Sequence, residues 1–403
     1  MSPEVPEKSR PFYLLPKVHK PRGKWPHPNM PEGRPIVADC GSETERVCKY
    51  IDHYLQPLAN NHPSYIKDTY DFISKVRGQT VSSNTLLVTG DVTGLYTNMN
   101  IDLTLNLVRE IFKKYPDPNR PDNQLLTLLE LTLKRNDFEF AGRIFLQICG
   151  TAMGKDYAPS LANIFLIYFD NLARRGFYIH PQLYFRFLDD IHFIWPGTRE
   201  ELQKYEEYLN TLMSGIKITL TIRESVIEFL DTIVYKVPTS PGLCVLRTRV
   251  YFKPTDTHQL LHANSFHPKH TPKGILKSQL IRFKRISTTK IDYEDACSTL
   301  YATLKNRGYS SRLFRRMKKQ IWASNYDNIR TVTHHVNQPT EEKEVWPLIN
   351  YYDPISVKIA NFTRRAVSTL KYAKDFTLIN CYRIHDNLTK KLVRSRFSQT
   401  EGP

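Results

Sequence analysis

The sequence predicts an α+β fold with a mixed front part and a helical, basic back part. Residues 1–252 alternate between helical periodicity and short apolar runs of strand length, whereas the pattern from residue 253 onward is mainly helical. The net charge of +17 is uneven, because residues 1–240 hold 28 Lys and Arg against 28 Asp and Glu, and residues 241–403 hold 29 against 12. This predicts that the back part lies along a polyanion such as nucleic acid. The alternative is a solvated basic surface that keeps the protein soluble.

The bulk properties exclude several classes of protein. The 403 residues suffice for a large core and two or three domains. No apolar run approaches the ~20 residues that cross a bilayer, so no membrane partner is expected. The six cysteines are scattered and form no Cys-x-x-Cys pair, which argues against a zinc ribbon and a disulfide framework and favours a reducing compartment.

Each predicted element follows from its periodicity and its boundary residues. The first segment, up to Asp39, is rich in Pro, Lys and Arg and is expected to form loops and short strands. Helices are predicted over 47–58, 101–115, 124–133, 159–173 and 199–213. Strands are predicted over 86–92, 138–140, 144–148, 216–222, 226–229 and 232–237. Residues 333–349 have the composition of a linker, and 355–397 are again helical and basic in pattern.

Two adjacent acids, Asp189 and Asp190, stand in the middle of the aromatic and aliphatic run from Phe185 to Trp195. Carboxylates are rarely placed among residues this apolar unless a positive group offsets their desolvation. The plain alternative is a β-turn, where Asp is common. An Asp-Asp pair at the tip of a strand–turn–strand hairpin is also the arrangement with which template-copying polymerases hold catalytic magnesium.

A site for two metal ions needs carboxylates from separate segments, and Asp91 is the candidate for the third acid. Asp91 closes the apolar run that starts at Leu86, and Gly94 lets the chain turn. Five residues after Asp91 stands Tyr96, where an aromatic ring can lie under an incoming sugar and clash with a 2′-hydroxyl. The alternatives are a capping role for Asp91 and a plain core position for Tyr96.

Two further segments offer contacts for a nucleotide. The loop over 149–163 contains Met153 and Gly154, and glycine lets a backbone approach a flat partner such as a base pair closely. A triphosphate needs cationic donors, although each such residue can also be ordinary surface charge. Three cations beside aliphatic strand residues are candidates: Lys17, Lys20 and Arg34.

These segments together resemble the reverse transcriptases of Penelope-like retroelements, which are relatives of telomerase reverse transcriptase. The matches extend over nearly the whole chain, in order. The main matching phrases are Leu-Pro-Lys-Val-His-Lys (15–20), Gly-Arg-Pro-Ile-Val-Ala (33–38), Thr-Gly-Asp-Val-Thr-Gly-Leu-Tyr-Thr-Asn (89–98), Gly-Thr-Ala-Met-Gly (150–154), Ala-Pro-Ser-Leu-Ala-Asn (158–163), Phe-Leu-Asp-Asp-Ile (187–191), Glu-Phe-Leu-Asp (228–231) and Phe-Lys-Pro-Thr-Asp (252–256).

The resemblance implies a right-hand polymerase with fingers and palm over 1–252, a helical thumb over 253–332, and a linker with a basic helical extension over 333–403. It implies an RNA-directed DNA polymerase that extends a primer 3′-hydroxyl by two-metal-ion nucleotidyl transfer and serves retroelement replication. The expected partners are an RNA template, a DNA primer and dNTPs. The expected cofactor is Mg²⁺, as two ions for which Mn²⁺ can substitute, and the expected location is the nucleus.

Residue by residue, the resemblance implies that Asp91, Asp189 and Asp190 are the catalytic acids and the metal ligands. Nucleotide contacts are implied for Lys17, Lys20, Arg34, Tyr96, Met153 and Gly154. Tyr96 matches the aromatic sugar gate. Met153 and Gly154 stand where many reverse transcriptases have Gln-Gly, so the glutamine contact is absent or supplied otherwise.

Nucleic-acid contacts are expected mainly in the back part. Phe252 and Lys253 lie near the position of the primer grip in the family that the chain resembles. Basic residues interleaved with aromatic ones predict further contacts along a nucleic-acid backbone. The candidates are Arg282, Lys284, Arg285, Arg315 and Arg316.

Other functions stay open at this point. A telomerase-like polymerase differs in the source of its template, and a catalytically silent nucleic-acid-binding derivative is disfavoured because all three acids are present. An RNA-directed RNA polymerase is disfavoured by Tyr96 at the gate position. No GIY-YIG endonuclease motif occurs before Pro403, so a fragment or an endonuclease-lacking type is expected.

Overall fold

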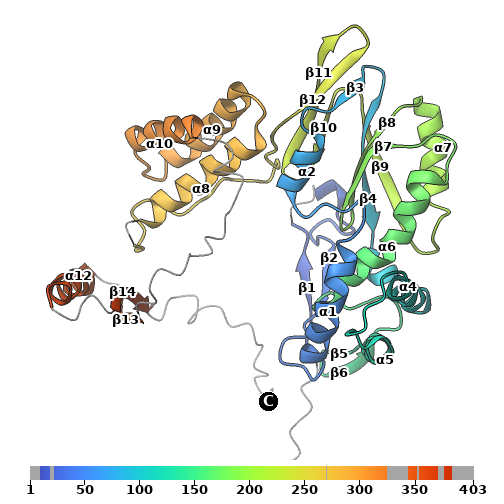
Figure 1. Cartoon of the computed structure of the whole chain (residues 1–403), viewed down its shortest axis with the longest axis horizontal. Coiled ribbons are helices and arrows are strands. Elements are labelled where there is room, and N and C mark those ends of the chain that lie inside the picture. Colours follow the sequence, from blue (N-terminus) through green and yellow to red (C-terminus); the bar gives the residue numbers. More distant parts are fainter. Residues whose placement is uncertain are drawn as a thin grey trace, which may run out of the picture. The chain divides into compact units, whose positions relative to one another are not determined.

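The structure, a computed structural model, describes residues 10–18, 22–268, 270–324, 344–351, 354–370 and 376–383. It divides into two compact units, Met1–Thr257 with Phe283–Ala296, and His258–Arg282 with Cys297–Pro403. The first unit mixes helices with antiparallel sheets (Figure 1), which confirms the α+β prediction. The predicted domain boundaries at 252 and 332 stay predictions. Within the described ranges, no helix combines the length and the apolar character that crossing a bilayer requires.

A four-stranded antiparallel sheet forms the centre of the first unit. Its order is β7 (Gln182–Phe187), β8 (Asp190–Trp195), β4 (Leu86–Thr93) and β9 (Lys217–Arg223). Successive side chains of a strand point to opposite faces, so Ile191, Phe193 and Trp195 share one face of β8. All three are buried in the main hydrophobic core. The predicted strand over 86–92 and the Asp-Asp hairpin are therefore confirmed.

Helices pack around this core. They are α1 (Glu45–Ala59), α4 (Ile101–Lys114), α5 (Asp122–Lys134), α6 (Ala158–Arg175) and α7 (Arg199–Leu209). Helix α6 contacts both α1 and α4, and most of its side chains are buried. Helix α7 begins with a capping box, in which the side chains of Thr198 and Glu201 bind each other's backbone N–H. The five helices predicted before residue 214 are confirmed, with small shifts at their ends.

A second antiparallel sheet has the order β10 (Val226–Phe229), β11 (Thr232–Ser240), β12 (Leu243–Val250) and β3 (Thr80–Ser82). Helix α2 (Thr69–Val76) contacts β12. Directly after α2, the Arg77 guanidinium donates to the hydroxyl of Thr248 and to the carbonyl of Ile286. The sequence analysis did not predict β3, β12 or α2, because β3 and α2 are short and β12 alternates apolar with basic residues.

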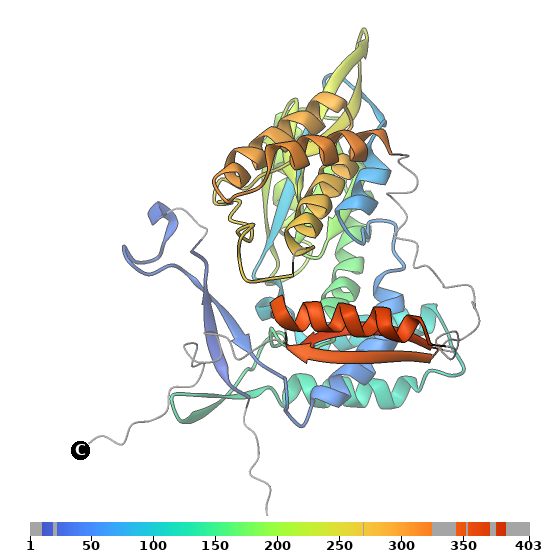
Figure 2. The same cartoon turned by 90° about the vertical axis from the view of Figure 1, so that its left-hand side faces the viewer.

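Two short strand pairs lie at one end of the first unit. They are β1 (Phe12–Pro16) with β2 (Gly33–Val37), and β5 (Asp137–Phe140) with β6 (Arg143–Leu146). Figure 2 shows the β1–β2 ribbon, in blue, beside the β5–β6 hairpin, and the rings of Phe12 and Phe138 stack with centroids 5.1 Å apart. Two short helical connectors belong to the same unit, η1 (Arg22–Lys24) and α3 (Leu95–Asn98). The hairpin predicted around Ala141 and Gly142 is confirmed.

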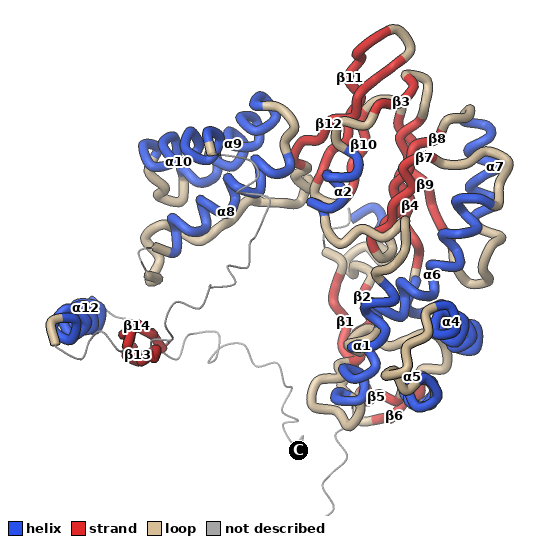
Figure 3. The backbone as a smooth tube through the Cα atoms, in the orientation of Figure 1, coloured by secondary structure: helices blue, strands red, loops and turns tan. Residues whose placement is uncertain are grey.

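Three helices follow the sheets: α8 (Thr271–Ile286), α9 (Lys290–Lys305) and α10 (Ser311–Ala323), drawn in blue in Figure 3. Helices α8 and α9 contribute residues to both units. Within the second unit, the rings of Tyr301 and Phe314 lie 4.5 Å apart, and Arg307 donates a hydrogen bond to the carbonyl of Leu260. The mainly helical pattern predicted after residue 253 is confirmed for these helices.

The C-terminal extension is not purely helical, which corrects the prediction for 333–403. Strands β13 (Glu344–Tyr351) and β14 (Phe376–Arg383) form a parallel pair, and α12 (Pro354–Ser368) contacts both. The β-branched and aromatic residues of β14 favour a strand, and a parallel pair requires a long connection such as a helix. Residues 384–397 of the predicted helix lie outside the described residues.

Candidate active site

Asp91 and Asp190 face each other across two neighbouring strands. In the antiparallel pairing of β4 with β8, Asp91 is the direct cross-strand partner of Asp190. Cross-strand partners project from the same face of a sheet, with Cα atoms about 4.5–5.5 Å apart. The central sheet thus brings together two acids that are far apart in the chain.

The third acid, Asp189, lies in the two-residue turn between β7 and β8. The turn begins at Leu188, whose φ of 51° is a left-handed conformation that leucine adopts at a cost of about 1–2 kcal/mol. The carbonyl oxygen of Asp189 accepts a hydrogen bond of 3.0 Å from the backbone N–H of Val92. Because Val92 directly follows Asp91, this bond fixes the turn beside β4. The structure therefore places all three acids together.

Burial and the neighbouring carboxylates oppose the ionisation of Asp189 and Asp190. Burial, followed by the charges of Asp189 and Asp91, raises the pKa of Asp190 to about 6. Burial is also the main cause of the raised pKa of Asp189, and repulsion by Asp91 adds to it. None of the three acids forms an ion pair with a described lysine, arginine or histidine. His192 does not compensate them, because burial lowers its pKa to about 3.

The three carboxylates are chemically suited to bind a divalent cation. Carboxylate oxygens are the ligands that Mg²⁺ prefers, and a bound cation offsets the repulsion among clustered acids. The acids do not form a preassembled cage: no three His, Cys, Asp or Glu side chains in the described parts of the chain are close enough together to hold a metal ion. Carboxylates without a neutralising charge repel one another, which favours such an open arrangement. The ligand roles of the three acids stay a prediction.

Arg34 and Tyr96 lie within electrostatic reach of Asp189. Tyr96 belongs to α3, just after β4. Burial, followed by the charge of Asp189, raises the pKa of its hydroxyl, and Arg34 acts in the opposite direction. Arg34 also counteracts the rise that burial causes in the pKa of Asp189. The Arg34 side chain is exposed on β2, so the structure brings an accessible guanidinium and an aromatic ring to the acids.

The two lysines that were predicted to bind phosphate are placed differently. The ammonium group of Lys17 forms an ion pair of 2.9 Å with the Glu32 carboxylate, on the segment that leads into β2. A phosphate must therefore compete with Glu32 for this lysine. Lys20 lies outside the described residues.

The glycine loop before α6 is fastened to the helix that carries Tyr96. The N–H of Gly150 donates to the carbonyl of Met99 at 3.0 Å, and the N–H of Thr151 donates to the carbonyl of Tyr96 at 2.7 Å. Gly150 has a φ of 71°, and a Cβ at this position would lie 2.1 Å from the Tyr96 oxygen. Only glycine permits this approach of the two backbones.

The other end of the loop is fastened to β2. The carbonyl of Met153 accepts a hydrogen bond of 3.2 Å from the N–H of Val37, and a Cβ on Gly154 would lie 2.1 Å from the Val37 oxygen. Both glycines thus allow close contact with the protein's own backbone, which links the strand of Arg34 to the helix of Tyr96. Nucleotide contacts of Met153 and Gly154 stay a prediction.

A pocket of about 140 Å³ opens beside Asp91 and Asp190, with walls from β4, β9 and the β10–β11 turn. The sequence analysis missed its polar lining, which consists of Thr89, Thr219, Thr221 and Glu228. Thr219 is the cross-strand partner of Asp91 on the β9 side. The alternation in Lys-Ile-Thr-Leu-Thr-Ile-Arg (217–223) is the signal that predicts two threonines on one face of a strand.

Some of the predicted nucleic-acid contacts are accessible. Lys253 is exposed, and its charge partly counteracts the rise that burial causes in the pKa of Asp190. Next to it, Phe252 packs edge-on against Phe283, with ring centroids 5.5 Å apart. Arg315 and Arg316 are exposed on α10.

Of the contacts predicted on α8, the structure speaks against that of Lys284. Lys284 is only 6% exposed, so its side chain cannot reach a phosphate while α8 stays packed. The guanidinium of Arg285 lies 3.5 Å from the ring centroid of Tyr70, which occupies one of its faces. Arg282 is half-buried. Nucleic-acid contacts of Arg282 and Arg285 stay a prediction.

Comparisons with known proteins find a family profile that matches one segment of the chain and solved structures with a similar fold. The profile of the animal helix-turn-helix domain matches residues 259–319, and no curated protein matches the chain. The telomerase of Candida albicans, solved with a TWJ fragment of telomeric RNA, has a TM-score of 0.50 at 9% sequence identity. The alignment covers 77% of this chain and 59% of the telomerase chain.

Two further structures are less similar. The apo telomerase of Candida tropicalis has a TM-score of 0.46 at 12% identity, and the RNA-dependent RNA polymerase of a human picobirnavirus has 0.48 at 11%. Each alignment covers 80% of this chain and 62% of the other. The chain thus spans about three-fifths of the length of these proteins. The likeness to the Candida albicans telomerase shows that the chain has a polymerase fold, as predicted.

Gly150→Ala is expected to destabilise the protein more than Gly142→Ala. The two glycines have similar φ values of 71° and 73°, so both variants carry a left-handed strain of about 1 kcal/mol. Only at Gly150 does the new Cβ meet backbone atoms, because nothing lies within 4 Å of that position at Gly142. Urea unfolding should show a loss of about 1 kcal/mol for Gly142→Ala and ~3 kcal/mol for Gly150→Ala. Equal losses would contradict the clamping of α3 by this loop.

Asp190→Asn is expected to stabilise the metal-free protein at pH 8 but not at pH 4. The pKa of Asp190 rises from 3.8 to about 6 on folding, so the folded state binds the proton more tightly. The stability that this proton contributes is present below about pH 4 and is lost as the pH rises through about 6. Asparagine avoids that loss.

The measurement for Asp190→Asn is urea unfolding with a chelator at both pH values, and the exposed substitution Glu207→Gln on α7 is the control. A variant that is less stable than the wild type at pH 8 contradicts the electrostatic description of the site.

Proposed function

We propose that the chain is an RNA-directed DNA polymerase that extends a primer 3′-hydroxyl with deoxynucleotides. The observation that carries this proposal is the gathering of Asp91, Asp189 and Asp190 on one sheet of a polymerase fold, without a described ion-pair partner. The motifs shared with Penelope-like reverse transcriptases support an RNA template, a DNA product and a role in retroelement replication.

Two Mg²⁺ ions are the proposed cofactor, for which Mn²⁺ can substitute, and the three acids are their proposed ligands. Ions bound there would lower the pKa of the attacking hydroxyl and would neutralise the triphosphate and the leaving pyrophosphate. Asp190 can act as a ligand only after it has lost its proton. Since its pKa in the metal-free protein is raised to about 6, Mg²⁺ should bind more tightly as the pH rises through that value.

Arg34 and Tyr96 are the proposed nucleotide contacts next to the acids. The exposed guanidinium of Arg34 can bind two phosphate oxygens at once. The backbone of Tyr96 is fastened to the glycine loop by the N–H of Thr151, which limits movement of the main chain that carries the ring. Lys17 reaches a phosphate only if it releases Glu32.

Helix α10 offers a face for nucleic acid. Residues at i, i+3, i+4 and i+7 lie on one side of a helix, and here all four are exposed cations: Arg312, Arg315, Arg316 and Lys319. Phe314 and Ile321 are buried on the other side. The helix-turn-helix profile matches residues 259–319, which include α10 up to Lys319, and helix-turn-helix motifs that bind DNA place one of their helices on it. We propose that this face binds template–primer phosphates. The basic run Arg-Arg-Met-Lys-Lys over 315–319 also has the composition of a nuclear localisation signal, which would account for the proposed nuclear location.

A telomerase-like polymerase is the second candidate, because the fold is similar to that of the Candida albicans telomerase. The two candidates differ in the source of the template. An integral RNA that co-purifies with the protein and directs synthesis favours the telomerase-like function, whereas copying of any supplied RNA favours the retroelement polymerase.

Primer extension on an RNA template with Mg²⁺ tests the proposed function. The wild type should add deoxynucleotides, and Asp189→Asn should reduce the rate by about 100-fold or more, because it removes a charge at the reacting centre. Glu207→Gln should behave as the wild type. A wild type that extends no primer with either Mg²⁺ or Mn²⁺ refutes the polymerase, and full activity of Asp189→Asn refutes the role of this acid.

Tyr96→Ala is expected to admit ribonucleotides. Removal of the ring leaves space for a 2′-hydroxyl, so the preference for dNTPs over rNTPs should fall by roughly 10- to 100-fold. Competing single-nucleotide additions on one RNA template measure this ratio directly. Tyr168→Ala, at an exposed position on α6, is the control for loss of an aromatic ring. Unchanged sugar discrimination in Tyr96→Ala contradicts its role as a gate.

A further inference from the structure

A buried arginine lies shortly before the acidic turn. Arg186 on β7 is 1% exposed, and each of the three nitrogens of its guanidinium donates at least one hydrogen bond. Nε and Nη2 bind the Asp170 carboxylate at 2.9 and 2.8 Å. Nη1 and Nη2 bind the side chain and the carbonyl of Asn163 at 2.7 and 3.3 Å. Nη1 also donates to the carbonyl oxygen of Leu188 at 3.1 Å.

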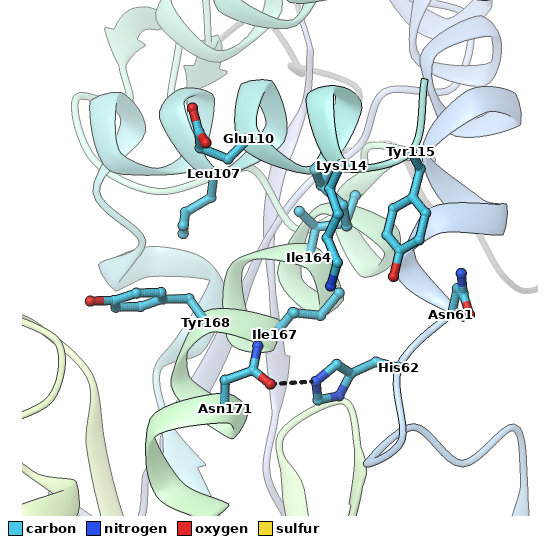
Figure 4. A pocket seen from close by; sticks show the side chains of 11 residues that line it. Asn61, His62, Leu107, Glu110, Lys114, Tyr115, Ile164, Ile167, Tyr168 and Asn171 are labelled. Atoms are coloured by element: carbon cyan, nitrogen blue, oxygen red, sulfur yellow. Dashed lines mark hydrogen bonds between the residues drawn. The ribbon is translucent and has the colours of Figure 1, made fainter. Parts of the chain in front are cut away.

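Asp170, the main partner of Arg186, is itself fixed by further hydrogen bonds. The hydroxyls of Ser64 and Tyr184 donate to its carboxylate at 2.6 and 3.1 Å. Ser64 in turn contacts His62 at 2.5 Å, and Figure 4 shows His62 bound to Asn171 at the wall of a cavity of about 260 Å³. Because Asp170 belongs to the buried helix α6, the network anchors the guanidinium to the rigid core of the first unit.

The bond to Leu188 acts on the strained residue of the turn. Leu188 has a positive φ, which leucine does not adopt without compensation from its surroundings. A hydrogen bond from a charged donor is stronger than a neutral one, so the guanidinium offsets this strain. The next residue is Asp189, whose carbonyl is held by Val92. The turn is therefore held on one side by α6, through Arg186, and on the other side by β4.

We propose that Arg186 is a positioning residue, which holds the turn so that Asp189 and Asp190 are presented to Asp91. A contribution of Arg186 to catalysis rests on the proposed polymerase function. Arg186 touches neither substrate nor metal in this account. It acts through the backbone of Leu188. A planar guanidinium can donate to Asp170, Asn163 and Leu188 at the same time, whereas the single ammonium nitrogen of a lysine cannot reach all three.

The test compares Arg186→Lys with Arg120→Lys. Arg120 is also buried, at 8% exposure, and donates to Asp122 and to the carbonyls of Phe112 and Tyr115, away from the turn. Both variants lose buried hydrogen bonds. Only Arg186→Lys should weaken Mn²⁺ binding, by about 10-fold or more, as measured by the electron paramagnetic resonance of free Mn²⁺. In the metal-free protein, hydrogen exchange at the Val92 amide should also become faster.

The kinetics should separate positioning from general damage. In Arg186→Lys the Mg²⁺ concentration for half-maximal primer extension should rise and kcat should fall, whereas KM for the nucleotide stays unchanged. If Arg186→Lys does not fold, Asn163→Ala carries the test, because it removes an acceptor that orients the same Nη1 and should shift Mn²⁺ binding in the same direction. A folded variant that binds Mn²⁺ as the wild type does overturns the proposal.

The Mn²⁺ titration requires no polymerase activity, so the two proposals can fail separately. A wild type that binds Mn²⁺ through the acids but copies no template refutes the polymerase. Unchanged Mn²⁺ affinity in the Arg186 and Asn163 variants of an active enzyme refutes the positioning role.

Discussion

Repulsion among three carboxylates is the constraint on which the site depends. Folding places Asp91 opposite Asp190 and fixes Asp189 beside them, although no described cation is paired with any of the three. Burial is the first cause of the raised pKa of Asp190, and the charges of Asp189 and Asp91 add to it. A bound divalent cation would convert the repulsion into attraction, so the cluster that destabilises the metal-free protein favours binding of that cation.

The surroundings of the acids compensate for this destabilisation. The opposite face of β8 is buried in the core, and α6 behind it supplies the acceptors that fix Arg186 and, through it, the turn at Leu188. On the side of Arg34 and Tyr96, the glycine loop fastens β2 to α3 by backbone contacts that exclude a Cβ. Rigid support from two sides allows a strained turn and repelling charges to persist at a functional site.

The strongest sequence patterns predicted the structure well. The features that the sequence did not predict depend on which residues from distant segments come into contact in the fold. Helices with clear periodicity and the Asp-Asp hairpin could be located because local pattern and burial agree there. The fate of Lys284 could not be predicted, since a basic residue in a basic helix looks exposed until the packing of that helix is known. The role of Arg186 was equally hidden, because its partners Asp170 and Asn163 come from a helix earlier in the chain. Strand β14 was missed because the helical pattern of α12 was extended past its end.

Thermal unfolding with and without Mg²⁺ at pH 8, at constant ionic strength, tests the central claim most directly. The melting temperature of the wild type should rise with Mg²⁺ concentration, because the folded state binds the ion and the unfolded state does not. The double variant Asp91→Asn/Asp190→Asn should be more stable than the wild type without Mg²⁺ and should not respond to it. An equal response of both proteins, or none in the wild type, would contradict the view that these carboxylates form a cation site.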